Sequence, residues 1–229
     1  MRTETAMQTR HRLLIGAWVL FAGCASIPYG ETRLASLDAT GPPGTPPSRV
    51  VDGHSWSVGL TMSNVSLPAG DWAPIETPLA LGIEGDYQAK DWELKPEFGV
   101  QYSKDSATFT VADPLGGTLN VWDELSLIDV FAGVAASFEL ERSALGVRVG
   151  GGLLVRFADL DETLDGLSSI TDSSLAPGIY VRGGPTMRVS DNSEIGLDIR
   201  ALFSDRLEFN NVSFDSNSIQ VGLVLRVYL

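Results

Sequence analysis

The chain has 229 residues, enough for one domain together with terminal targeting or linker segments. It carries 16 basic and 29 acidic residues, and this net charge of −13 argues against nucleic acid and anionic headgroups as electrostatic partners. A single cysteine excludes an internal disulfide and a multi-cysteine metal site. Because 44% of the residues are nevertheless hydrophobic, we expect apolar and acidic surfaces to be segregated.

Residues 1–24 are predicted to be a secretory signal peptide. A basic cluster at 10–12 precedes the apolar run 13–22, which is shorter than the roughly 20 residues that a membrane-spanning helix needs. The run ends in Leu-Phe-Ala-Gly-Cys and resembles a bacterial lipoprotein signal, which makes Cys24 the lipidation candidate. Ordinary cleavage nearby, for instance after Ala25, is the alternative.

Residues 25–54 are predicted to form a flexible linker. They are rich in glycine, proline, serine and threonine, most densely at 41–48. Such a composition cannot bury enough apolar surface to fold by itself. The proline-rich part also allows a partner motif, although a spacer is the simpler interpretation.

From residue 55 onward the dominant pattern is alternation with period two, as half-buried strands require. None of the 45 positions on the apolar side of these segments is charged, whereas the intervening positions hold arginines and carboxylates. So strict a partition is expected when one face meets a medium that cannot solvate charge. Eight segments show the pattern: 56–62, 79–87, 94–102, 128–138, 145–157, 177–189, 195–203 and 219–229.

The gaps between these segments alternate in length. The long gaps lie near 66–76, 104–125, 158–174 and 204–216, and they are separated by short turns. Long loops at one rim and tight turns at the other are typical of transmembrane barrels. The predicted fold class is therefore all-β, with residues 55–229 forming an eight-stranded antiparallel up-and-down transmembrane β-barrel.

Alternation alone does not say which face points outward, so a soluble barrel with an apolar interior is the alternative. An eight-stranded barrel is barely wide enough for side chains, and dozens of large apolar ones would overfill it. Eleven glycines lie on the polar face against three on the apolar face, which suits a crowded interior. We therefore expect the apolar face to contact lipid.

The end of the chain carries a more specific resemblance. Residues Ile219–Leu229 alternate without interruption and end on an apolar residue. This resembles the final strand of outer-membrane proteins, and the region 55–229 resembles the OmpA/OmpX/OmpW-like superfamily of small barrels. The resemblance implies a location in the bacterial outer membrane, contact with outer-membrane lipid, and recognition of Ile219–Leu229 by the barrel-assembly machinery.

Charged residues of the polar face are predicted to pair inside the lumen, because isolated charges in a narrow interior are costly to desolvate. The alternative is a gated ion path lined by charge. The small width of an eight-stranded barrel favours the salt-bridge network. Its predicted members are Glu84, Glu97, Glu139, Arg148, Arg182, Arg188, Asp198, Arg200 and Arg226.

The four long gaps hold 14 acidic and two basic residues, so much of the negative charge is expected on the outer side. Within them Asp159, Asp161, Glu162 and Asp165 are candidate ligands for Ca²⁺ or Mg²⁺, since hard cations prefer carboxylate oxygens. The spacing is not that of an EF-hand loop, and a solvated acidic loop is the simpler interpretation.

The sequence contains no recognisable catalytic or cofactor motif, and its two histidines stand at positions 11 and 54. We therefore expect a non-enzymatic barrel without a cofactor, which acts in envelope integrity or in surface interaction through its acidic loops. The first alternative is a narrow channel for ions or small hydrophobic solutes. The second is an outer-membrane lipid hydrolase.

Overall fold

The computed structural model describes residues 55–72, 75, 77–89, 92–112, 116–140, 143–164 and 168–229. The predicted signal peptide, the lipidation candidate Cys24 and the predicted linker lie outside the described residues. No helix in the described part of the chain is long and apolar enough to cross a membrane.

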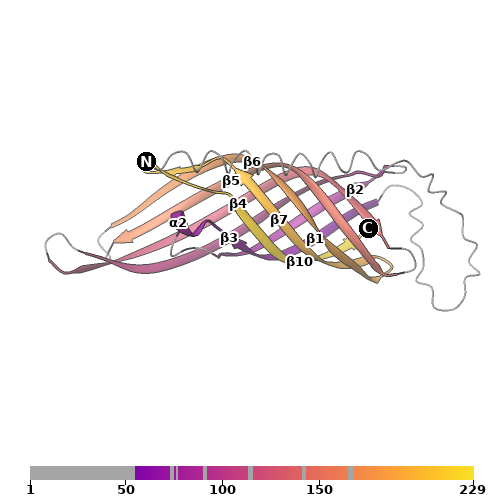
Figure 1. The fold of residues 1–229 in the computed structure, drawn as a ribbon, viewed down its shortest axis with the longest axis horizontal. Coiled ribbons are helices and arrows are strands. Elements are labelled where there is room, and N and C mark those ends of the chain that lie inside the picture. Colours follow the sequence, from indigo (N-terminus) through magenta and orange to yellow (C-terminus); the bar gives the residue numbers. More distant parts are fainter. Residues whose placement is uncertain are drawn as a thin grey trace, which may run out of the picture. The chain divides into compact units, whose positions relative to one another are not determined.

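Eight antiparallel strands close into a barrel in the order β1-β10-β7-β6-β5-β4-β3-β2 (Figure 1). The last strand therefore pairs with the first, from Ser57 opposite Tyr228 to Ser66 opposite Ile219. The elements are β1 (Ser55–Ser66), α2 (Ala69–Trp72), β2 (Leu79–Gln88), β3 (Lys95–Ala112), β4 (Thr118–Glu139), β5 (Leu145–Leu164), β6 (Ser168–Ser190), β7 (Ser193–Ser204), β8 (Leu207–Phe209), β9 (Val212–Phe214) and β10 (Ser218–Tyr228).

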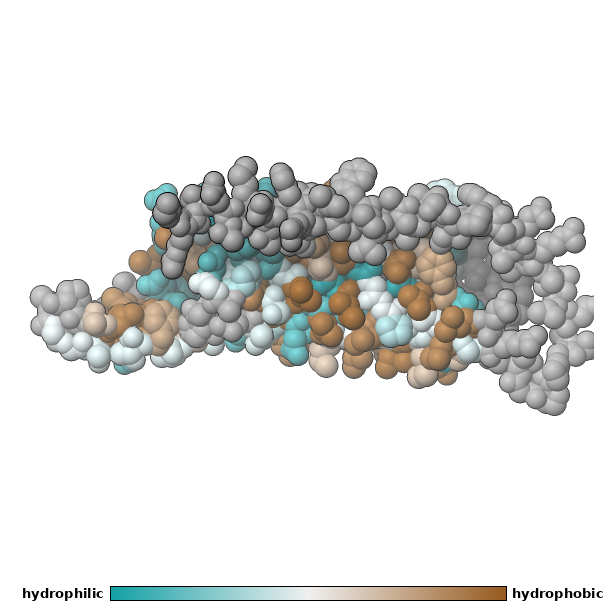
Figure 2. Space-filling model, viewed as in Figure 1, coloured by the Kyte–Doolittle hydropathy of each residue, from teal (hydrophilic) through white to brown (hydrophobic). Residues whose placement is uncertain are grey.

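The outer wall of the barrel is an apolar belt. Burial alternates along the strands, and Leu60, Leu153 and Leu223 are 57%, 69% and 51% exposed although they are large hydrophobic residues. Hydrophobic side chains accordingly gather on the barrel wall in Figure 2. Aromatic rings reinforce the belt at the end with short turns, where Trp56 packs on Tyr87 with ring centroids 4.8 Å apart. The predicted orientation, with the apolar face outward, is confirmed.

Four strands extend far beyond this belt, which corrects the prediction of long loops at 104–125 and 158–174. The strands β3, β4, β5 and β6 contain 18, 22, 20 and 23 residues, and they stay paired to their tips. These strand extensions are not predicted from the sequence because the outward positions above the belt are polar, so apolar and polar residues no longer alternate there. We call this extension, residues 105–112, 118–125, 159–164 and 168–174, the outer sheet.

The other two predicted loops also contain short elements. The gap at 66–76 holds the single turn α2, and the gap at 204–216 holds the β8–β9 hairpin. Asn210 and Asn211 form the two-residue turn of this hairpin with φ values of 49° and 66°. Asparagine tolerates this left-handed backbone region, which a tight hairpin turn requires.

Glycines let neighbouring strands and interior side chains approach closely inside the barrel. Gly133 lies opposite Gly152 in the register of β4 and β5. A Cβ atom added to Gly152 would lie 2.2 Å from the carbonyl oxygen of Ala132, and one added to Gly133 would lie 2.6 Å from the hydroxyl of Tyr180. Glycine on the inner face thus leaves room for large interior side chains.

Candidate functional site

The lumen at the level of the belt is filled by charged side chains from inward positions of seven strands. Each is at most 9% exposed, and the positive and negative groups are equal in number. Balanced pairing is expected here, because a buried charge without a partner is strongly destabilising. The five cations are Arg148, Arg156, Arg182, Arg200 and Arg226, and the five anions are Glu84, Asp86, Glu97, Asp129 and Asp198.

Glu84 is the centre of the larger group of ion pairs. Its Oε2 atom lies 2.5 Å from Nη1 of Arg182 and 3.4 Å from Nη2 of Arg200, and its Oε1 atom pairs with Arg226. One carboxylate thus joins arginines from three strands, β6, β7 and β10. Arg226 also reaches Glu194 at 2.7 Å, towards the short-turn end.

A second carboxylate, Glu97, extends the same group across the barrel. It accepts a hydrogen bond of 3.0 Å from Arg148 and one of 2.7 Å from the Tyr180 hydroxyl. Tyr180 also packs edge-on against Phe131, and the Arg200 guanidinium lies 4.3 Å from the Phe131 ring centroid. Polar and aromatic side chains therefore contact one another across the lumen.

A separate ion pair lies nearer the outer mouth. Arg156 donates to both carboxylate oxygens of Asp129, at 2.7 and 2.8 Å, in the fork geometry that gives arginine its strongest pairs. Its Nη1 atom donates to the backbone carbonyl of Ser216 at 2.6 Å. Arg156 thus connects the belt level of the barrel to the segment between β9 and β10.

An apolar cluster, which we call the cap, lies at the outer mouth. The indole Nε1 of Trp72 donates to the Asp215 carbonyl at 2.6 Å, and its ring lies 4.9 Å from that of Phe214. The Asp215 backbone amide in turn donates to Asp71 at 2.7 Å, so α2 and the β8–β9 hairpin are held together. The buried members are Val65, Leu67, Trp72, Ile75, Ala80, Leu125, Leu127, Ala158, Ala176, Leu207 and Phe209.

The structure brings seven of the nine predicted lumen residues into the larger ion-pair group: Glu84, Glu97, Arg148, Arg182, Asp198, Arg200 and Arg226. The other two predicted residues are not part of this group. Glu139 and Arg188 pair with each other at the short-turn end, where their side chains are 65% and 20% exposed. Both residues occupy inward positions of the alternating pattern, but they lie at the ends of their strands, where the interior opens to water.

Sequence reasoning also omitted four interior groups. Asp86, Asp129 and Arg156 are buried ion-pair members, and Glu194 pairs with Arg226. Asp86, Asp129 and Arg156 lie at intervening positions of the segments 79–87, 128–138 and 145–157, so the alternation places them on the inner face, and only their membership of the network was not predicted.

The acidic segment near 160 belongs to strand β5 and not to a loop. Asp159, Asp161 and Glu162 lie on β5, and Asp165 lies outside the described residues. Within the described part of the chain, no three acidic, histidine or cysteine groups are arranged to hold a metal ion. As a cation site, this segment stays an expectation from the sequence.

Two pairs of carboxylates lie directly opposite each other on β4 and β5, one on each face of the outer sheet. Glu124 is opposite Asp161 on the outward face, and Asp123 is opposite Glu162 on the inward face. Burial, followed by the charge of Glu162, raises the pKa of Asp123 above the usual carboxyl range.

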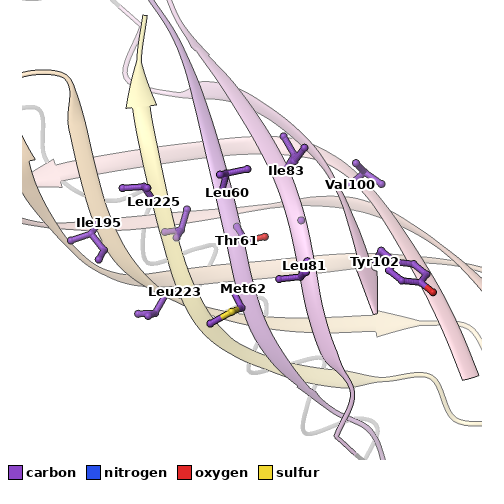
Figure 3. A pocket seen from close by; sticks show the side chains of 12 residues that line it. Leu60, Thr61, Met62, Leu81, Ile83, Val100, Tyr102, Ile195, Leu223 and Leu225 are labelled. Atoms are coloured by element: carbon purple, nitrogen blue, oxygen red, sulfur yellow. The ribbon is translucent and has the colours of Figure 1, made fainter. Parts of the chain in front are cut away.

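A shallow groove of about 640 Å³ runs along the outside of the barrel over β1, β2 and β10. Figure 3 shows that it is lined by outward side chains such as Leu60, Leu81 and Leu225. It lies within the apolar belt, so its shape fits lipid acyl chains and it offers few polar groups to any other ligand.

No protein-family profile and no curated protein matches the sequence. Among solved structures, Neisserial surface protein A matches with a TM-score of 0.50 and 15% identity over 76% of this chain and 96% of that one. A major outer membrane protein from Thermus thermophilus matches with a TM-score of 0.50 and 14% identity, over 77% and 99%. Likeness at these identities establishes the fold.

The closed fold and the apolar outer surface both indicate that the protein spans a membrane. The strands form a closed antiparallel barrel, which among the described residues leaves no strand edge without a neighbouring strand at the level of the belt. The belt presents hydrocarbon outward, and the charges at this level point inward and pair. The chain is therefore an eight-stranded transmembrane β-barrel with the fold of the small outer-membrane proteins.

Proposed function

We propose that this protein is a non-enzymatic, non-conducting outer-membrane barrel that presents its outer sheet and cap for interactions at the cell surface. One observation supports the proposal: the interior holds the ion-pair network at the level of the belt and the apolar cap at the outer mouth. A permeant ion would have to cross both.

The contacts in the network support a closed lumen. Arg182 holds Asp198 at 2.9 Å and Glu84 at 2.5 Å, so its charge is satisfied within the protein. A hydrated ion gains little from groups that already neutralise one another, and it must shed water to pass between them. Above this layer the cap offers only buried apolar side chains, 5% exposed or less.

The outer sheet supports a role in surface interaction. Beyond the barrel, and within the part of the chain that the structure describes, residues 105–112 of β3 pair only with β4, and residues 168–174 of β6 pair in a ladder only with β5. The β8–β9 hairpin approaches β6, with the Glu208 amide donating to Ser174 at 2.8 Å. Strands that extend beyond the membrane provide a rigid platform for a partner, since free sheet edges and faces are common recognition elements.

Electrical recording tests the closed lumen. The purified protein is inserted into planar bilayers, and folded insertion is verified by a difference in gel mobility between unboiled and boiled samples. We expect no steady current at any moderate voltage. Reproducible single-channel steps would overturn the proposal and support the narrow channel instead. Release of fatty acids from phospholipid by the same preparation would contradict the non-enzymatic assignment.

A further inference from the structure

The outward face of the outer sheet continues the lipid-facing wall of the barrel. Ile128 is an outward residue of the belt on β4, and the next outward position towards the tip of the sheet is Ser126. The β8–β9 hairpin lies on the other side, because its backbone amides donate to the inward side chains Ser174 and Asp172. The outward face therefore begins where the belt ends, and most of its side chains are exposed.

Trp122 is a large aromatic residue in the middle of a polar row on this face. It lies opposite Thr108 on β3 and Thr163 on β5, and Thr163 lies opposite Ser169 on β6. The Trp122 side chain is 39% exposed, and among the described residues no ring or guanidinium packs on it and its indole N–H donates to no group. Trp72, by contrast, is buried in the cap and donates to a backbone carbonyl. An exposed ring with an unused donor is a surface that a ligand can cover.

Trp122 lies too far from the belt to belong to an aromatic girdle at the edge of the lipid. Six residues separate it from Ile128 along β4, which is roughly 20 Å of strand at about 3.4 Å per residue. At a strand tilt of about 40°, this places the ring roughly 15 Å above the belt. The headgroup layer of a phospholipid bilayer is only about 5–8 Å thick on each side. Trp122 is therefore at the height that the sugar chains of a membrane glycolipid reach.

The charges near Trp122 are already met by groups of the protein. Glu124 forms an ion pair with Lys104, and Asp161 accepts a hydrogen bond from the Thr171 hydroxyl. At the outward positions of the outer sheet that the structure describes there is no cation, so an anionic ligand finds no uncompensated positive group there. The other groups around the ring are hydroxyls, which both donate and accept hydrogen bonds. Such a surface fits a neutral ligand that carries many hydroxyls.

We call the surface formed by Ser106, Thr108, Thr110, Trp122, Thr163 and Ser169 the hydroxyl face. We propose that it binds the sugar chain of a glycolipid of the surrounding membrane, with one sugar ring stacked on Trp122. A sugar ring has an apolar C–H side that packs on an indole and hydroxyls at its edge that pair with threonine and serine. Because the hydroxyl face is continuous with the belt, a lipid whose acyl chains contact the belt holds its sugars beside this face at high effective concentration. This inference rests on the proposed function, because it names the partner chemistry for the outer sheet.

Lipid titration tests the proposal on the intact protein in phosphatidylcholine nanodiscs. The probe is lipopolysaccharide with a complete core saccharide, added in increasing mole fraction, and the backbone amide signals of residues 108 and 163 are followed by NMR. Lipopolysaccharide truncated after its innermost sugars is the control, because it keeps the acyl chains and the phosphates of the lipid anchor but lacks the sugars that reach Trp122. We expect saturable shifts with the complete core and none with the truncated lipid. The soluble core oligosaccharide, released from the same lipid, should not saturate the shifts at millimolar concentration.

Matched variants separate the contacts of the hydroxyl face from general effects. Trp122→Ala should raise the mole fraction at half-maximal shift about three- to tenfold, as expected for loss of one ring-stacking contact. Trp92→Ala removes an exposed tryptophan at the short-turn end and should change that mole fraction less than about twofold. Thr108→Val with Thr163→Val keeps the side-chain shape, removes two hydroxyls and should also raise it, whereas Thr186→Val at an inward position should not. Unboiled gel mobility verifies that each variant is folded.

The possible outcomes are distinct. Equal shifts with the truncated lipid would overturn the inference in favour of contact with lipid phosphates, and saturation by the soluble oligosaccharide would overturn it in favour of a free glycan. Equal effects of Trp122→Ala and Trp92→Ala would show that the hydroxyl face is not the site. Absence of any shift would also overturn the inference, yet a silent planar bilayer would leave the closed-barrel function standing. Channel activity would instead contradict the proposed function, whatever the sugar does.

Discussion

Replacing Glu84 by glutamine tests whether the interior ion-pair network holds the barrel together. Glutamine keeps the size of the side chain and removes its charge. The Glu84 side chain is 4% exposed and contacts Arg182, Arg200 and Arg226. After the change, five buried arginines face four buried carboxylates, so one positive charge inside the barrel loses its compensation.

Breaking a buried ion pair from one side costs roughly 3–5 kcal/mol, and we expect Glu84→Gln to lower the free energy of unfolding by about that amount. Glu139→Gln is the matched control, because Glu139 also pairs with an arginine but is 65% exposed. Exposed pairs contribute at most about 1 kcal/mol. Removing the surplus cation with Arg200→Met in the Glu84→Gln background should recover part of the loss.

Equilibrium urea unfolding in phospholipid vesicles, followed by tryptophan fluorescence and by unboiled gel mobility, measures these differences. The reasoning would be refuted if Glu84→Gln lowered the free energy of unfolding by less than about 1 kcal/mol, or if Glu139→Gln lowered it equally. Either result would mean that the buried ion pairs of Glu84 contribute no more than an exposed pair.

Three further perturbations address the wall, the cap and the outer sheet. Gly152→Ala places a methyl group 2.2 Å from a carbonyl oxygen on β4. This change should lower the free energy of unfolding by about 1–3 kcal/mol in the same urea assay. The control Gly70→Ala should leave that free energy unchanged, because nothing lies within 4 Å of the added methyl group. Trp72→Ala should lower the free energy of unfolding by about 3–5 kcal/mol if the cap unfolds together with the barrel. It should also make the segment 205–217 sensitive to protease, because the side chain no longer holds Asp215. Unchanged digestion would argue against a packed cap. The raised pKa of Asp123 means that the outer sheet is more stable while this group is protonated, and that stability falls as the pH rises through the raised pKa. Hydrogen exchange at 118–125, corrected for intrinsic rates between about pH 4 and pH 7, should show this dependence, and Asp123→Asn should abolish it.

The fold could be predicted from the sequence because a bilayer imposes a simple rule. Each strand at the level of the belt must present hydrocarbon outward, and alternation therefore marks Leu60, Val149 and Leu223 as lipid-facing and Arg182 as interior. The alternating lengths of the gaps between segments add the up-and-down topology, and in the structure β10 pairs with β1.

Above the belt the same rule no longer applies, and there the prediction failed. The outward positions Lys104, Ser106 and Thr108 continue β3 in water, where polar residues are acceptable on either face. Hydrophobic periodicity therefore disappears while backbone pairing continues. The cap was missed for a related reason, because Trp72 and Phe209 contact each other only after distant segments meet.

Partner choice inside the lumen depends on side-chain reach, which sequence spacing does not specify. Arg226 and Glu84 are 142 residues apart, and Arg148 reaches Asp86 from the opposite half of the chain. Alternation predicts that such groups share an interior. It does not predict that Glu84 contacts three arginines while Glu139 lies at the rim.

The hydrogen bond from Arg156 to the Ser216 carbonyl has a consequence for the order of assembly. Ser216 lies two residues before the first residue of β10, so we expect its position to be defined only when β10 has joined both β7 and β1. The contact between Trp72 and Asp215, which spans 143 residues, carries the same requirement. Contacts so distant in the chain form late, because the entropy of closing the intervening loop must be lost first. We therefore expect these contacts at the outer mouth to form at the end of biogenesis, after the two terminal strands have paired.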